Sequence, residues 1–302
     1  MTSWSTELEL VGAGGEPVDL WRTINSHGLV DLPPTRIEAE ARTLEATVRI
    51  RGARPRTIVL SEGAAGRALL RAVGPRPGAR LARDLAGAAA HLLRLDEDLA
   101  GFYAIAAADP ALAWATRGAG RIVRSPTVFE DVVKTICTTN CAWSATERMV
   151  GALVSNLGDE APGGRRAFPT PAAMAVAGEA FYRDVVRAGY RGRYLLELAT
   201  RCADGGLDLE ALNDPELSDD EVEQRLLALP GVGPYAAAHA MMMLGRYSRL
   251  ILDSWTRPKY ARLNGGKPVK DATIVRRFRR YGHWAGLAFW LVLTRDWVEE
   301  NA

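Results

Sequence analysis

The most informative stretch of the sequence is LPGVGP, residues 229–234. Gly231 and Gly233 are one residue apart, which predicts a tight turn whose backbone can approach a ligand closely. Helices are expected on both sides, at 219–228 and 235–244, and the second helix would offer free N-terminal N–H groups to an anion such as a phosphate. A simple αα-corner closed by glycines is the alternative interpretation.

A single carboxylate follows this turn. Asp253 lies 20 positions after Gly233, at the end of the apolar run 250–252. It is a candidate for a catalytic acid placed behind a phosphate site. It is equally a candidate for the cap of a helix that begins near Ser254, because aspartate is a preferred capping residue. The two roles are compatible.

Composition narrows the class of protein without identifying its function. The 302 residues carry 38 basic and 36 acidic side chains, a balance that neither requires nor excludes nucleic acid. No apolar run approaches the ~18 residues of a membrane helix, and the first residues lack a secretory signal pattern. Three cysteines cannot form a disulfide framework, so a reducing cytoplasm is expected.

The chain is expected to divide at residues 95 and 96. The segment 1–95 reads as β-rich, with strand candidates at 17–21, 44–50 and 57–60 and a Pro/Gly-rich turn at 74–78. From 96 to 302 the pattern is helical, and Ser125 with Pro126 predicts one helix start. Helices are expected at 81–95, 102–109, 111–116, 127–139, 143–157, 172–177, 181–188, 191–204, 218–228, 235–244, 271–281 and 284–297. This predicts an α+β fold with a small N-terminal antiparallel sheet.

The hairpin, its following helix and Asp253 resemble the helix-hairpin-helix DNA glycosylase superfamily. Further segments resemble the same family: SPTVFE at 125–130, ICTTN at 136–140, FPTP at 168–171 and AGYRGRY at 188–194. The resemblance covers about residues 96–297. It implies a helical body of two subdomains after a small sheet domain, double-stranded DNA with a damaged base as partner, and Asp253 as the catalytic carboxylate. In such a site the carboxylate would stabilise the positive charge that develops on the sugar.

The residue after the hairpin indicates the reaction type. Members of the family that also cut the strand carry a lysine two positions after the last hairpin glycine, and here that position is Tyr235. Neither Lys134 nor Lys259 fits the motif. The resemblance therefore implies a monofunctional enzyme, and Gly-Pro-Tyr is similar to the Gly-Pro-Trp of bacterial 3-methyladenine glycosylases of the second type. Tyr235 would stack on a flipped, alkylated purine, although simple packing also explains an aromatic residue there.

Further binding residues are assigned by the same resemblance. His239 lies one helical turn after Tyr235, and Trp284 resembles a C-terminal pocket tryptophan; both are predicted to bind the base, with core packing as the alternative. Asn140 is predicted to fill the gap left by the flipped nucleotide, or to end a helix. Gly231, Gly233 and Arg257 are predicted to contact DNA, with a solvated charged face as the alternative for the cation.

Two motifs indicate different lesions. The Gly-Pro-Tyr hairpin favours alkylated purines, whereas the CTTN and GYRGRY segments are nearer the 8-oxoguanine type. A non-catalytic DNA-binding protein and a strand-cutting enzyme with another amine are further alternatives. No cofactor and no metal site are expected, apart from a monovalent cation at the hairpin. The resemblance implies a monomeric, cytoplasmic bacterial enzyme associated with the nucleoid.

Overall fold

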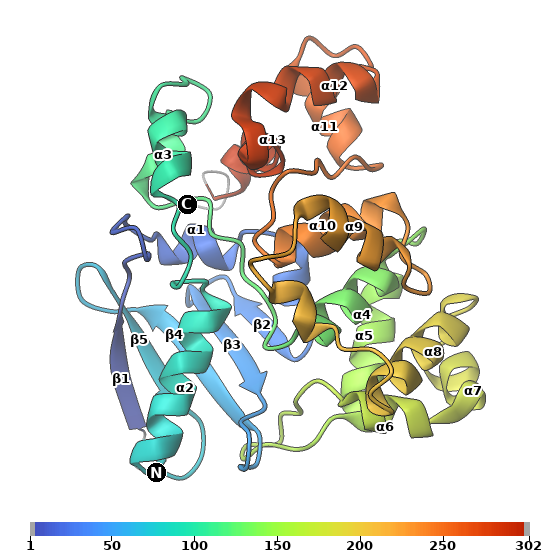
Figure 1. Cartoon of the computed structure of the whole chain (residues 1–302). Helices are drawn as coiled ribbons and strands as arrows, with labels where there is room; N and C mark the ends of the chain where they lie inside the picture. The colour runs from blue at the N-terminus through green and yellow to red at the C-terminus, as the bar shows by residue number, and fades with distance from the viewer. Residues whose placement is uncertain (1–3, 299–302) are drawn as a thin grey trace.

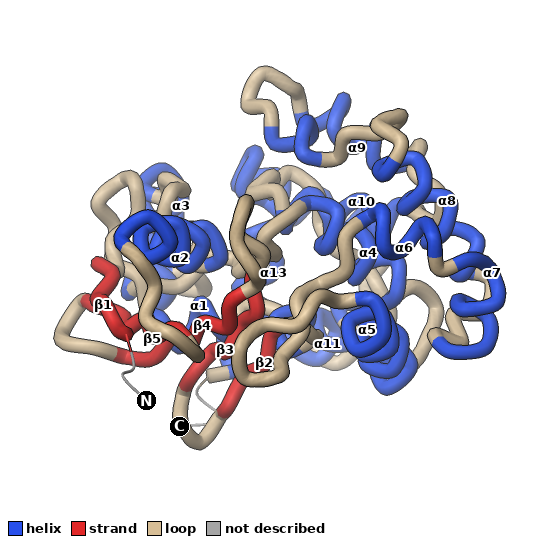
Figure 2. Tube along the Cα trace, turned by 90° about the horizontal axis from the view of Figure 1, so that it is seen from below, coloured by secondary structure: helices blue, strands red, loops and turns tan. Residues whose placement is uncertain are grey.

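A five-stranded antiparallel sheet lies near the N-terminus of the computed structural model, which describes residues 4–298 (Figure 1). The strand order is β1-β5-β4-β3-β2. The strands are β1 (Trp4–Glu9), β2 (Thr35–Glu38), β3 (Thr43–Val48), β4 (Arg56–Glu62) and β5 (Arg67–Ala72). Figure 2 shows the sheet at one side of the molecule and the helices α4 to α8, within residues 128–203, at the other.

The sheet forms because its strands present apolar side chains to one face. Leu44 of β3 pairs with Leu60 of β4, and both are fully buried. The helix α2 (Ala79–Leu92) buries Leu85 and Leu92 in the same hydrophobic cluster. Its apolar stripe at helical spacing therefore closes the core of the sheet domain.

Helices make up most of the remaining chain. The α-helices are α1 (Leu20–Ile24), α3 (Ala100–Ala107), α4 (Val128–Thr138), α5 (Trp143–Leu157), α6 (Pro171–Val176), α7 (Gly178–Ala180), α8 (Arg191–Ala203), α9 (Asp219–Leu227), α10 (Pro234–Met243), α11 (Thr256–Leu263), α12 (Asp271–Phe278) and α13 (Ala285–Thr294). Short 3-10 helices are η1 (Gly28–Asp31), η2 (Ala113–Arg117), η4 (Glu210–Asn213), η5 (Arg279–Trp284) and η6 (Arg295–Trp297), and η3 (Phe181–Val185) is a short π-helix. The predicted α+β fold class is confirmed.

The helix α10 connects the two cores of the helical body. One core is built mainly from α4, α5, α8 and α9, and the other from α3, α12 and α13. Ala237 and Met241 of α10 belong to the first core, whereas Ala238 and Met242 belong to the second. A helix that is apolar on all sides is stable only when it is buried on all sides. The hairpin in front of α10 is therefore attached to the centre of the molecule.

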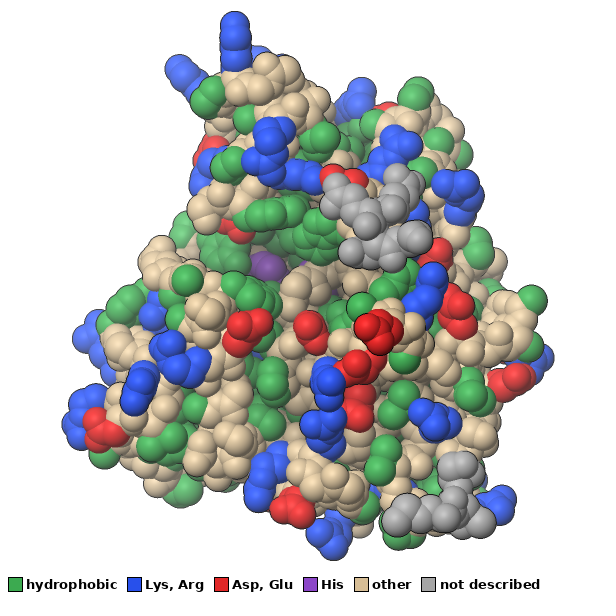
Figure 3. Space-filling view, turned by 180° about the vertical axis from the view of Figure 1, so that it is seen from behind, with side chains coloured by type: hydrophobic (Ala, Val, Ile, Leu, Met, Phe, Trp, Pro, Cys, Tyr) green, Lys and Arg blue, Asp and Glu red, His purple; other side chains and the backbone are tan. Residues whose placement is uncertain are grey.

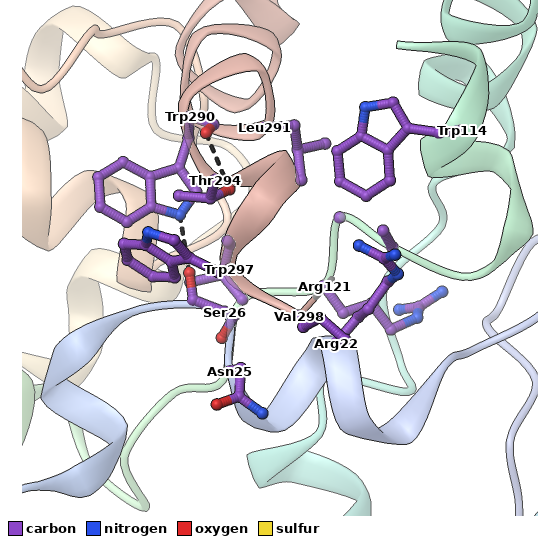
Figure 4. A pocket seen from close by; sticks show the side chains of 13 residues that line it. Arg22, Asn25, Ser26, Trp114, Arg121, Trp290, Leu291, Thr294, Trp297 and Val298 are labelled. Atoms are coloured by element: carbon purple, nitrogen blue, oxygen red, sulfur yellow. Dashed lines mark hydrogen bonds between the residues drawn. The ribbon is translucent and has the colours of Figure 1, made fainter. Parts of the chain in front are cut away.

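A buried ion pair joins the sheet domain to the helical body. The guanidinium of Arg121 is fully buried and donates to Glu16 Oε1 and to the carbonyl oxygens of Arg94 and Glu97. A narrow cavity of about 20 Å³ lies beside Arg121, between α1 and α13 (Figure 4). There the indole of Trp290 donates to the Ser26 carbonyl at 2.7 Å. The cavity has room for about one water molecule. We therefore assign the hydrogen bond between Trp290 and Ser26 to the packing of α13 against the residues that follow α1.

Several predicted elements differ in the structure. The segment 17–21 is no strand, because Asp19 accepts a hydrogen bond from the Arg22 amide and starts α1. Thr127, and not Ser125, caps α4, and the Ser125 amide instead donates to the Asp131 carboxylate at 3.1 Å. The predicted helix at 111–116 is the 3-10 turn η2. The predicted division at 95 and 96 stays a prediction, and its outer ends, 1–3 and 299–302, lie outside the described residues.

We predict that Arg121→Met lowers the free energy of unfolding by about 3–5 kcal/mol, because the buried Glu16 carboxylate would lose its ion-pair partner. Chemical denaturation measures this loss. The control is Arg67→Met, which breaks an exposed pair with Glu7 and should cost below about 1 kcal/mol. Equal losses in the two variants would contradict the linking role of Arg121.

Candidate active site and nucleic-acid interface

The glycine hairpin has the geometry that its sequence predicts. The helix α9 starts with a capping box formed by Ser218 and Glu221 and ends before the turn. Gly231 has a φ of 78°, and a Cβ at this position would lie 2.8 Å from Cδ2 of Tyr194. Gly233 is the N-cap of α10 and is exposed. Pro234, the first residue of α10, has no N–H, but the amides of Tyr235 and Ala236 have no partner within the helix, so they are available to an anion.

An open cleft of roughly 880 Å³ lies in front of the hairpin. It brings together six of the eight predicted site residues: Asn140, Gly231, Gly233, Tyr235, Asp253 and Arg257. These residues come from three places in the chain: the end of α4, the α9–α10 hairpin and the start of α11. The other cleft residues are Thr138, Thr139, Cys141, Tyr190, Tyr194, Val232, Pro234, Ala236, Leu252 and Ser254.

Asp253 caps the turn that leads into α11. Its Oδ1 accepts hydrogen bonds from the amides of Trp255 and Thr256, at 2.8 and 2.6 Å. Its own amide donates to Thr256 Oγ1 at 2.8 Å. These hydrogen bonds hold the carboxylate in place at the cleft wall. Within the described chain they use Oδ1, which leaves Oδ2 for a ligand in the cleft.

Tyr235 contributes an aromatic face to the cleft. Its hydroxyl lies 3.2 Å from Thr138 Oγ1, and burial raises the pKa of the phenol. The phenol is therefore neutral, and the ring is held by the backbone of α10 at one end and by the hydroxyl contact with Thr138 at the other. No lysine lines this cleft among the described residues: Lys134 is buried beside Glu130 at 2.7 Å, and Lys259 pairs with Asp296.

His239 lies behind Tyr235 and outside the cleft lining. Its ring centroid is 5.8 Å from that of Tyr235 and 6.2 Å from that of His27. Both ring nitrogens are buried, and neither finds a hydrogen-bond partner among the described residues. Burial lowers the pKa of His239 to about 4, and burial together with the neighbouring His239 lowers that of His27 to about 3. Both imidazoles are therefore neutral near pH 7.

Trp284 is not brought to the cleft. It stacks on Tyr247 with a centroid separation of 5.6 Å and contacts Phe102 at 5.7 Å. All three residues belong to the second helical core or pack against it. The core-packing alternative thus accounts for its position.

Asn140 lines the cleft just after the end of α4. This residue has a left-handed φ of 46°, which asparagine tolerates, and its Nδ2 donates to the Tyr190 hydroxyl at 3.4 Å. The Arg191 guanidinium lies 4.6 Å from the Tyr190 ring and donates to Thr139. Sequence reasoning assigned no role to Tyr190 or Tyr194, although the GYRGRY segment contains both.

Arg257 lines the cleft and already forms an ion pair. Its guanidinium donates to both carboxylate oxygens of Asp271, at 2.8 and 2.9 Å. No group of three or more His, Cys, Asp or Glu within residues 4–298 is arranged to hold a metal ion. A membrane-crossing helix is likewise not found in this part of the chain.

We predict that Gly231→Ala lowers the free energy of unfolding by about 1–3 kcal/mol, because a left-handed alanine is strained and its Cβ meets Tyr194. Gly233→Ala is the matched control, since its φ is −103° and a Cβ there meets nothing within 4 Å. Thermal denaturation compares the two. If both variants are equally stable, the hairpin turn does not depend on the left-handed glycine.

We predict that His239→Leu is at least as stable as the parent at pH 7, because it removes two buried, unpartnered nitrogens. Burial holds the pKa of His239 near 4, below the ordinary 6.5, so the unfolded chain takes up the proton first as the pH falls. The stability of the parent relative to the variant should then fall by about 1.4 kcal/mol per pH unit between about 6.5 and 4. A difference that stays constant over this range, in denaturation curves, would contradict the buried neutral state.

Comparison with solved structures finds a similar fold in several DNA glycosylases. The chain is similar to a 3-methyladenine DNA glycosylase from Archaeoglobus fulgidus, with a TM-score of 0.74 and 20% identity over 98% of this chain and 99% of that chain. It is similar to the 8-oxoguanine glycosylase/lyase of Clostridium acetobutylicum in complex with double-stranded DNA, with a TM-score of 0.73 and 18% identity over 94% and 93%. The 3-methyladenine DNA glycosylase of Schizosaccharomyces pombe, with abasic DNA, matches with a TM-score of 0.51 and 17% identity over 66% and 97%.

The comparisons at the level of sequence give no match, neither with protein-family models nor with curated proteins. At about 20% identity, the structural likeness establishes the fold. The chain therefore has the fold of DNA glycosylases from both the 3-methyladenine and the 8-oxoguanine groups.

Proposed function

We propose that the chain is a monofunctional DNA glycosylase of base excision repair, and that it releases a damaged purine from duplex DNA. The observation that carries the proposal is the single cleft that Asp253, Tyr235 and the Gly231–Gly233 hairpin share. A carboxylate, an aromatic face and an anion-binding turn are the three elements that a flipped nucleotide needs.

The hairpin would hold the DNA backbone next to the lesion. Its glycines let the main chain approach a phosphate, and the N-terminus of α10 carries a partial positive charge. Such contacts position the duplex without reading its sequence. This suits an enzyme that must act wherever damage occurs.

Asp253 would act on the sugar of the flipped nucleotide. As the base leaves, positive charge develops on the sugar, and a fixed carboxylate oxygen stabilises that charge. The Oδ1 hydrogen bonds to Trp255 and Thr256 hold the group, so Oδ2 would be left to act on the sugar without reorganisation. Water would be the nucleophile, because the described cleft offers no lysine to form a Schiff base.

Tyr235 would stack on the base, and Asn140 would enter the space that the base leaves in the duplex. The neutral phenol offers an electron-rich face, which favours a cationic alkylated purine. Asn140 is exposed and has a left-handed φ just after the end of α4. Filling the gap would offset part of the few kcal/mol that unstacking the nucleotide costs.

An 8-oxoguanine-type substrate is the second candidate. The contacts that Tyr190 makes with Asn140 and with the guanidinium of Arg191 favour it, since these residues come from the segments that resemble that group. A monomeric, cytoplasmic enzyme that needs no cofactor, beyond a monovalent cation at the hairpin, completes the proposal.

We predict that the purified chain releases an alkylated purine from duplex DNA and leaves an intact strand with an abasic site. Oligonucleotides that carry 3-methyladenine-type, hypoxanthine, 8-oxoguanine or uracil lesions identify the substrate by base release. Borohydride should trap no protein–DNA adduct. Release of 8-oxoguanine alone would favour the second candidate, a trapped adduct would contradict the monofunctional reaction, and release from no substrate would favour a non-catalytic DNA-binding protein.

A further inference from the structure

The segment 257–280 concentrates positive charge. This segment, named the basic lobe below, contains nine Lys or Arg residues and one acidic residue, Asp271. The rest of the chain has 29 basic against 35 acidic residues, so the small net charge of +2 conceals a strong asymmetry. A solvated protein face ordinarily mixes both signs, and a cluster of one sign raises its electrostatic potential at a cost in self-repulsion.

Five cations of the basic lobe are free to contact a ligand. They are exposed, and no ion pair with them is found within residues 4–298: Arg262, Lys267, Lys270, Arg276 and Arg279. The remaining four cations contact other residues of the same chain. Arg257 pairs with Asp271, Lys259 with Asp296 and Arg280 with Asp109, and Arg277 donates to the Tyr260 hydroxyl at 3.0 Å.

One side of the basic lobe packs into the second helical core. Ile274 and Phe278 of α12 are buried in the second helical core, whereas Arg276 on the same helix is exposed. The turn between α11 and α12 contains Gly265 and Gly266, both with positive φ. Arg276 of α12 therefore faces solvent, and Lys267 of the turn is exposed as well.

The basic lobe extends one wall of the cleft. Its first residue, Arg257, lines the cleft together with Asp253, and α11 begins at Thr256, whose amide donates to the Asp253 carboxylate. The hairpin forms another part of the same cleft wall. Figure 3 shows Lys and Arg side chains projecting from the top of the molecule, where Figure 1 places α11 and α12.

We propose that the basic lobe is a second DNA-binding surface, which holds backbone phosphates beyond those at the hairpin. The inference rests on the proposed function, because it takes duplex DNA as the ligand. The two surfaces differ in physical character. The hairpin acts through neutral main-chain amides, whereas the basic lobe acts through solvated cations, which release condensed counterions when they meet phosphates.

This difference gives the test a specific readout. Each cation that neutralises a phosphate contributes about 0.9 to the slope of log K against log salt concentration for duplex DNA. A triple variant, Lys267→Gln, Lys270→Gln and Arg276→Gln, should therefore lower the slope by up to about 2.7. Gly231→Ala should weaken binding and leave the slope unchanged, because it removes no charge.

The control variant removes the same charge from the sheet domain. Arg51→Gln, Arg54→Gln and Arg76→Gln changes three exposed arginines that lie outside the cleft. Fluorescence anisotropy with a labelled, undamaged duplex, at salt from about 50 to about 200 mM, measures all four proteins. We expect that only the lobe variant has a smaller slope of log K against log salt concentration than the parent.

Equal slopes for the lobe variant and the sheet-domain control would overturn the proposal. Tighter binding of the parent to phosphatidylglycerol vesicles than to duplex DNA would overturn it as well and assign the surface to a membrane. Failure of the proposed function has a different signature, because the slope is measured without any lesion. If the slope changes but no base is released, the DNA-binding surface stands and the glycosylase reaction falls.

Discussion

The left-handed turn at Gly231 is the constraint on which the site depends. Its φ of 78° turns the chain between α9 and α10 while the main chain lies against the Tyr194 ring. A residue with a Cβ would have to displace that ring. Because the turn is fixed, α10 starts at Pro234 with Tyr235 facing the cleft. The proposed anion site and the aromatic face are therefore set by one backbone conformation.

The packing of α10 against both helical cores holds the hairpin turn in place. The helix is buried on all sides, so the hairpin cannot move without disturbing Met241 in one core and Met242 in the other. Asp253 is held in a second way, through the hydrogen bonds that begin α11. The proposed reaction thus combines two rigid parts of the fold, and preorganised charge of this kind needs no rearrangement as the reaction proceeds.

Local patterns predicted much of this arrangement. The glycine hairpin, the helix α5 at 143–157 and the capping role of Asp253 follow from residues close together in the sequence. Long-range contacts explain what local patterns do not reveal. The strands β1 and β5 are recognisable only through their pairing, and Trp284 is drawn into the second core by Tyr247 and Phe102. Tyr190 and Tyr194 reach the cleft through the folding of α8 against the hairpin, which no local pattern reveals.

The most direct test of the central claim is the single-turnover rate of base release by Asp253→Asn. Asparagine keeps the Oδ1 acceptor that caps α11, so the change removes the charge and preserves the local structure. We expect a rate at least about a hundredfold lower than that of the parent, with unchanged affinity for DNA. A variant that releases the base at the parental rate would contradict the role of Asp253 and the mechanism built on it.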